Sequence, residues 1–156
     1  MKYETVRPNI KTGDVLAWSS DTFLGKLVRS MTESTYSHLG LAVILRDRVF
    51  VLEAVHPLVR LVPLSSLLPA YVVHMNSPLS QEAEDYAFSL VGTKHYSFID
   101  AVKGMFTSKV DTEDFQCAEL VKVILEKNGN KIASINTPSD VIRVLEKHDK
   151  TPIYME

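Results

Sequence analysis

The stretch HLGLAVIL (residues 38–45), followed after two residues by RVFVLEAV (residues 48–55), decides the fold of this chain. Both segments are rich in β-branched and other apolar side chains, and this composition predicts two strands. The residues between them, Arg46 and Asp47, predict an antiparallel hairpin with a tight turn, although they are not a favoured turn dipeptide. The rest of the chain is interpreted outward from this hairpin.

The register of the hairpin decides which polar side chains share a face. With the turn centred on the two linking residues, Glu53 faces Gly40. Side-chain alternation then puts His38 on the same face, diagonal to Glu53. A carboxylate within an apolar strand usually needs a partner, and His38 is the economical candidate. Two alternatives stay open: Glu53 points to solvent from an edge strand, and His38 is a hydrogen-bonded structural residue.

Outside the hairpin, the chain predicts an α+β domain with a mainly antiparallel sheet and helices packed on it. Helices are predicted from apolar spacing and from end signals, such as Ser80 before and Gly92 after one helix and Gly129 after another. The further strands are expected within residues 11–18, 58–64, 71–75 and 151–156, and the helices within residues 20–31, 80–92, 96–106, 111–129 and 137–149.

The composition is that of one globular domain, which we expect to span residues 1–156. Hydrophobic residues make up 46% and charged residues 23%, both ordinary values. The net charge of −2 lacks the basic excess that drives nucleic-acid binding, so no nucleic-acid partner is expected. The chain shows no apolar leader and no run of roughly eighteen apolar residues. We therefore expect a cytoplasmic protein without stable membrane insertion.

The single cysteine, Cys117, excludes an internal disulfide framework and lies in the predicted helix 111–129. Near the first turn of a helix, backbone N–H groups and the helix dipole favour a thiolate, whereas the neighbouring carboxylates oppose it. A reactive Cys117 therefore needs a local cation, most simply an imidazolium. The alternative is a core residue, because Cys117 shares its helical spacing with the apolar residues Leu120, Val121, Ile124 and Leu125.

The histidines do not predict a metal site. No two of them have the spacing that places a pair of zinc ligands on one helix, so neither a metal nor another cofactor is expected. The five are His38, His56, His74, His95 and His148.

Three short motifs in a fixed order resemble a known family. SHLGLAV (residues 37–43), LEAV (residues 52–55) and CAELV (residues 117–121) are similar to motifs of the permuted papain-like thiol enzymes. These are circularly rearranged relatives of the NlpC-type cell-wall peptidases, and the similarity is to their YiiX-like branch. The resemblance covers about residues 13–144. Ordinary papain-like enzymes have the order Cys, His, polar residue, whereas the permuted group has His, acid, Cys.

The resemblance implies a circularly permuted papain-like (NlpC-type) domain with a catalytic triad. Cys117 would be the nucleophile, His38 the general base and acid, and Glu53 the third polar member. The backbone N–H of Cys117 would donate to the oxyanion. Ala118 stands where the family often has serine, and Gln116 stands where it often has an aromatic residue.

These departures leave the second oxyanion donor open. Tyr36, Gln116 and Tyr96 are the candidates for oxyanion or substrate binding, although both tyrosines could simply pack. Glu119 resembles the family's acid after the cysteine, but it should not share a helix face with Cys117, and we interpret it as a local structural contact.

The function implied is a cysteine hydrolase that cleaves an amide, such as a peptide or a peptidoglycan peptide, through a thioacyl-enzyme. One alternative is a lipid acyltransferase or thioesterase with the same triad. Another is a ligand-binding or structural module without catalysis. The expected partner is a small peptide, amide or acyl substrate, and the oligomeric state stays open. A cell-wall role without a signal peptide would need a phage or effector context.

Overall fold

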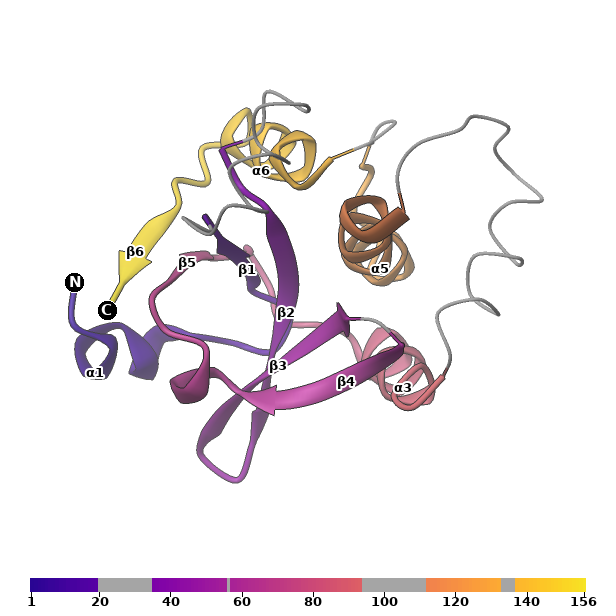
Figure 1. The fold of residues 1–156 in the computed structure, drawn as a ribbon, viewed down its shortest axis with the longest axis horizontal. Coiled ribbons are helices and arrows are strands. Elements are labelled where there is room, and N and C mark those ends of the chain that lie inside the picture. Colours follow the sequence, from indigo (N-terminus) through magenta and orange to yellow (C-terminus); the bar gives the residue numbers. More distant parts are fainter. Residues whose placement is uncertain (20–34, 56, 94–111, 133–136) are drawn as a thin grey trace.

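The computed structural model describes residues 1–19, 35–55, 57–93, 112–132 and 137–156. In the helix that begins at Thr112, side chains are described from Cys117 onward. The helices predicted at residues 20–31 and 96–106 lie outside the described residues. Within the described ones, the fold is α+β, as the sequence predicts (Figure 1).

In the described part of the chain, six strands form one sheet in the order β4-β3-β2-β1-β5-β6. Every neighbouring pair is antiparallel, as predicted for most of the sheet. The hairpin strands β2 and β3 lie inside the sheet, so Glu53 is not on an edge strand. The strands are β1 (Val15–Trp18), β2 (His38–Leu45), β3 (Arg48–Val55), β4 (Leu58–Pro63), β5 (Ala70–Val73) and β6 (Ile153–Met155).

The hairpin has the predicted register. Leu45 pairs with Arg48 across the turn. Arg46 and Asp47 have φ values of 47° and 62°. Positive φ at both central residues is what a two-residue type I′ turn requires, because its twist matches that of the flanking strands. Arg46 and Asp47 therefore make the tight turn although they are not a favoured turn dipeptide, because one long strand on each side holds the turn.

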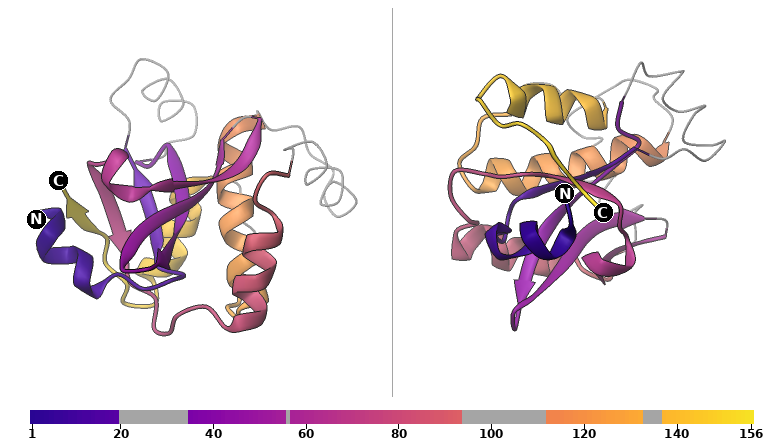
Figure 2. Two further views of the ribbon diagram at one scale, coloured as in Figure 1. Left: turned by 90° about the horizontal axis from the view of Figure 1, so that it is seen from below. Right: turned by 90° about the vertical axis from the view of Figure 1, so that its left-hand side faces the viewer.

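Three helices cover one face of the sheet, as the views in Figures 1 and 2 show. They are α3 (Gln81–Ser89), α5 (Thr112–Lys127) and α6 (Pro138–Glu146). The helix α5 packs on β2 and β3 and lies between α3 and α6. Its apolar stripe is fully buried against the sheet, and the core that results includes Leu39, Leu41, Val121, Ile124 and Leu125.

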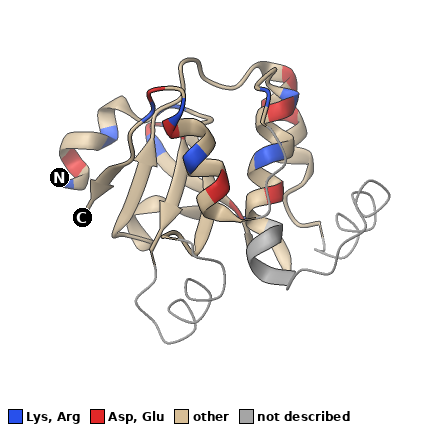
Figure 3. Ribbon diagram, turned by 90° about the horizontal axis from the view of Figure 1, so that it is seen from above, with Lys and Arg blue, Asp and Glu red and all other residues tan. Residues whose placement is uncertain are grey.

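The helix ends carry the expected chemistry. Ser80 Oγ accepts a hydrogen bond from the Ala83 N–H at the start of α3. Thr137 and Asp140 form a reciprocal capping box at the start of α6. Both basic and acidic residues occur along the helices (Figure 3). Among the described residues, no helix combines the length and apolar character that crossing a membrane requires.

The opposite face of the sheet has its own apolar cluster, which the sequence did not predict. The short helix α1 (Tyr3–Val6) and a 3-10 turn (Arg7–Asn9) bring Val6 and Ile10 over this face. There they pack with residues such as Leu16, Val51, Leu64 and Met155. A helix of four residues is too short to show an amphipathic period, so no sequence pattern marked it.

Candidate functional site

His38 is the first residue of β2, and the chain leading into it is held on two sides. The Thr35 N–H donates to Ser139 Oγ of α6 at 2.9 Å. The Ser37 N–H donates to the Trp18 carbonyl at the end of β1 at 2.8 Å. The helix α6 and the strand β1 therefore determine where His38 enters the sheet.

Glu53 contacts His38 across the hairpin. Its Oε2 lies 2.7 Å from His38 Nε2, and the residue is only 2% exposed. Gly40 allows β2 and β3 to lie close together here, because a Cβ at residue 40 would lie 2.6 Å from Val51 Cγ1 and 3.0 Å from the Leu52 carbonyl oxygen. The pairing expected from the hairpin register is therefore present, and Glu53 does not point to solvent.

Arg60 is a third member of this polar chain, and the sequence interpretation missed it. It pairs with Glu53 directly across β3 and β4. Its Nε and Nη2 lie 2.8 and 2.7 Å from Glu53 Oε1. The signal was a lone cation inside the apolar segment LVRLV, but only the register between β3 and β4 shows what it faces.

Cys117 is 1% exposed and lies on α5, with its thiol hydrogen-bonded to the imidazole of His38. Thus one hydrogen-bonded chain joins α5, β2 and β3. Cys117 also belongs to the apolar core, so the two interpretations of this residue are not exclusive.

The helical position of Cys117 corrects one expectation. Since α5 begins at Thr112, Cys117 is the sixth helical residue and lies in the second turn. In an α-helix, an N–H at that position bonds to the carbonyl four residues earlier. It is therefore not one of the free N-terminal donors, and we do not assign it to an oxyanion.

The pKa values follow from this arrangement. Burial lowers the pKa of His38, but hydrogen bonds that the ring makes to Cys117 and Glu53, together with the negative charges of these two groups, outweigh burial and raise it from 6.5 to about 9. Burial raises the pKa of Glu53, but contacts with His38 and then with Arg60 outweigh burial and lower it below 4.5. At neutral pH the site therefore contains an imidazolium held by a carboxylate.

Trp18 forms one wall beside His38. It is the cross-strand partner of His38, and their ring centroids lie 5.4 Å apart at an interplanar angle of 43°. The indole Nε1 donates to the Leu67 carbonyl at 2.7 Å, which fixes the ring. The His38 side chain remains 26% exposed, so solvent reaches one part of the imidazole.

Of the three candidates for oxyanion or substrate binding, the structure describes the side chain of Tyr36 alone. Tyr36 packs edge-on against Tyr71 with ring centroids 5.3 Å apart. Burial and then the charges of Glu146 and Tyr71 raise its pKa. These contacts tie Tyr36 to α6 and β5. Gln116 precedes Cys117 in α5, but its side chain and the whole of Tyr96 lie outside the described residues.

Glu119 is 7% exposed and lies two residues beyond Cys117 on α5. Burial raises its pKa to about 7, although the charge of Lys122 acts in the opposite direction. Two residues correspond to about 200° around a helix, so Glu119 does not share the face of Cys117. It is not part of the hydrogen-bonded chain described above.

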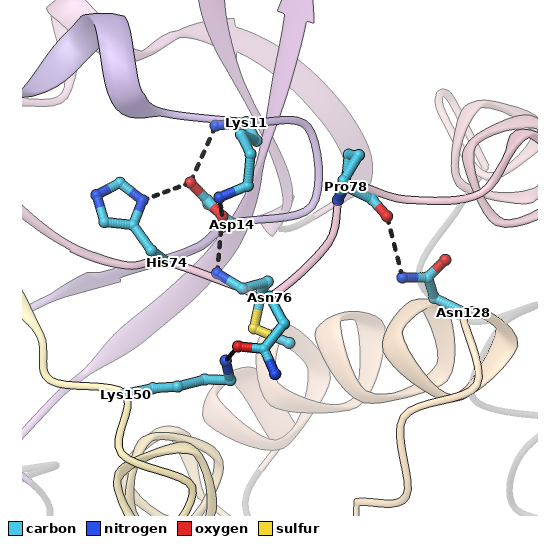
Figure 4. A network of polar contacts seen from close by, with 8 residues as sticks. Lys11, Asp14, His74, Asn76, Pro78, Asn128 and Lys150 are labelled. Atoms are coloured by element: carbon cyan, nitrogen blue, oxygen red, sulfur yellow. Dashed lines mark hydrogen bonds and ion pairs between the residues drawn. The ribbon is translucent and has the colours of Figure 1, made fainter.

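A second histidine–carboxylate pair lies at the other end of β1 (Figure 4). His74 Nδ1 is 2.7 Å from Asp14 Oδ2, and the buried Asp14 also accepts from the backbone N–H groups of Met75 and Lys11. Asp14 precedes the first residue of β1, whereas His38 pairs with the last one. This second pair ties β1 to the end of β5.

Comparisons with known proteins identify a similar fold. No protein-family model matches the chain, and no curated protein matches it. The crystal structure of the metalloprotein YiiX from Escherichia coli O157:H7 is similar, with a TM-score of 0.58 and 19% sequence identity. The similarity covers 93% of this chain and 88% of that chain. At this identity the likeness concerns the fold alone, and the chain therefore has a YiiX-like fold.

Proposed function

We propose that this protein is a cysteine hydrolase with a permuted papain-like (NlpC-type) site, in which Cys117 is the nucleophile, His38 the acid and base, and Glu53 the orienting carboxylate. One observation carries the proposal: a thiol, an imidazole and a buried carboxylate form a single hydrogen-bonded chain. Such a base–orienter pair beside a nucleophile is what covalent acyl transfer requires.

The reaction has two steps. The Cys117 thiolate attacks the substrate carbonyl carbon, and the imidazolium of His38 gives its proton to the departing nitrogen as the C–N bond breaks. Water then attacks the thioester while His38 takes up a proton. The acid product leaves, and the thiolate–imidazolium pair is restored.

Amide cleavage suits the charge of His38. An amine leaves well only when it is protonated, and a His38 pKa of about 9 keeps the imidazolium populated at neutral pH. The substrate we propose is therefore a peptide or related amide. Acyl esters and thioesters, which lipid acyltransferases and thioesterases use, need this proton less.

YiiX is described as a metalloprotein, but the donor set of this chain does not fit a metal site. Zinc sites use at least three protein ligands, commonly His, Cys, Asp or Glu. Both oxygens of Glu53 already accept from His38 and Arg60. Across the described ranges, no three such side chains come together to hold a metal ion. The proposed mechanism contains no step through a metal.

Alkylation of the single thiol by iodoacetamide tests the proposal. We expect Cys117 to react at pH 6 to 7 in the native protein, and His38→Ala to slow this reaction by about tenfold or more, because the imidazolium stabilises the thiolate. Mass spectrometry counts one adduct. A substrate screen should then show amide hydrolysis that Cys117→Ser abolishes.

His74→Ala is the matched control, because it removes a histidine with an equally short carboxylate contact at the opposite end of β1. It should leave the alkylation rate unchanged. A native thiol that reacts only after denaturation would instead favour a module without catalysis. Turnover of acyl esters or thioesters, but not of amides, would favour acyl transfer between lipids or thioester hydrolysis.

A further inference from the structure

Glu53 divides its two oxygens between two cations. Oε2 receives the His38 ring, and Oε1 receives two N–H groups of Arg60. The two partners differ in exposure: Glu53 is 3% exposed at its side chain, whereas Arg60 is 48% exposed. A buried carboxylate is thus connected to the molecular surface through a guanidinium.

The two cations also differ in whether their positive charge persists through the proposed reaction. His38 must lose and regain its proton in each cycle of the proposed reaction. While the imidazole is neutral, a buried Glu53 with no other cation would bear an uncompensated charge, which is costly in an apolar surrounding. The guanidinium of Arg60 keeps its charge at every working pH. It can therefore compensate Glu53 in both states of His38.

The contact also fixes orientation. Arg60 lies directly opposite Glu53 in the sheet, and its planar fork contacts one carboxylate oxygen at two points. This contact leaves the other oxygen turned toward His38. Among the described residues, the groups facing His38 are Cys117 from α5, Glu53 from β3 and the Trp18 ring from β1.

We propose that Arg60 is a positioning residue of this site, which keeps Glu53 ionised and aimed at His38 while His38 changes its charge. This inference rests on the proposed function for its purpose, but its test does not require a substrate. The lowered pKa of Glu53 agrees with it, since Arg60 is one of the two groups that overcome the effect of burial.

The experiment compares wild type, Arg60→Gln, Arg60→Lys and a control. Glutamine keeps a hydrogen-bond donor but removes the charge, and lysine keeps the charge but loses the fork. Arg143→Gln removes a guanidinium from a comparable ion pair, since Arg143 Nη1 lies 3.1 Å from Asp140 on α6. Two readouts are used: the titration of the ¹³C-labelled Glu53 carboxyl by NMR, and the rate of Cys117 alkylation from pH 4.5 to 8.

In Arg60→Gln, the titration midpoint of Glu53 should move upward toward 4.5, because a cation that favours the carboxylate is gone. Alkylation at about pH 5 should fall roughly fivefold, as expected when a partly exposed charge-assisted contact is lost, and the loss should shrink toward pH 8. Arg60→Lys should restore most of the titration and part of the rate. Arg143→Gln should match wild type in both.

The inference is overturned if folded Arg60→Gln keeps both the Glu53 midpoint and the alkylation profile of wild type. Should Arg60→Gln fail to fold, Arg60→Lys carries the test, and equality with wild type at every pH overturns the positioning role. Failure of the proposed function has a different signature: wild type would then react no faster than His38→Ala, whatever Arg60 does.

Discussion

His38 links the site to the stability of the fold, because its proton is held more tightly in the native protein than in the unfolded chain. Its pKa rises from 6.5 to about 9, chiefly through the contacts with Cys117 and Glu53 that outweigh burial. A group with a raised native pKa stabilises the fold in its protonated form. This contribution is complete below pH 6.5 and is lost as the pH rises to about 9.

The free energy of unfolding should therefore depend on pH through His38. Relative to His38→Gln, we expect wild type to be more stable at pH 6 than at pH 9.5, with the advantage shrinking by on the order of 1–3 kcal/mol. Urea unfolding of both proteins across this range measures the difference. Parallel curves for the two proteins would show that the native imidazole does not hold its proton as described.

At this scale the sequence predicted the contacts that depend on one local turn. A two-residue connection determines the hairpin register, so the contact between His38 and Glu53 could be predicted. The contact of Arg60 follows from the same kind of turn, because only two residues link β3 to β4 and this connection pairs Glu53 with Arg60, but the sequence analysis did not derive that register. The contact of Trp18 could not be predicted, because it depends on β1 lying beside β2, and no local pattern specifies that pairing.

Between elements, α6 is tied to the chain that enters β2. Ser139 is 8% exposed in the first turn of α6, and its Oγ accepts from the N–H groups of Thr35 and Tyr36. Element positions were predicted well where caps and periodicity mark them, as at Thr137. No sequence pattern predicts this contact of Ser139, because a serine that accepts hydrogen bonds from a distant backbone cannot be told from any other helical serine in the sequence.

Ser139→Ala should destabilise the protein by about 1–3 kcal/mol, because two backbone donors lose their acceptor in a partly buried place. It should also slow Cys117 alkylation, since the position of His38 is then less well determined. Ser89→Ala is the control: Ser89 ends α3, and its exposed Oγ donates to the Tyr86 carbonyl. If both variants lose the same small amount of stability, the anchoring role of Ser139 is wrong.

Over the whole molecule, the first and last residues of this chain lie side by side (Figure 1). The Glu156 N–H donates to the Met1 carbonyl at 3.0 Å, and the Tyr3 N–H donates to the Glu156 carbonyl at 2.9 Å. The order of the elements along the sequence could thus change while their arrangement in space stays the same. The core contacts of α5 with β2 and β3 do not depend on which comes first.

A rearranged chain should therefore keep the site. We would join Glu156 to Met1 through a short glycine-rich linker and open the chain between α3 and α5, so that Cys117 precedes His38 and Glu53. Because the joined ends are already hydrogen-bonded, closure costs little, and we expect cooperative unfolding within about 1–3 kcal/mol of wild type. The pH profile of Cys117 alkylation should also be retained.

A control chain opened within β2, between Leu41 and Ala42, should not fold, because both residues are fully buried in a central strand. If the first rearranged chain also fails to fold, the order of the elements along the chain itself matters to this fold.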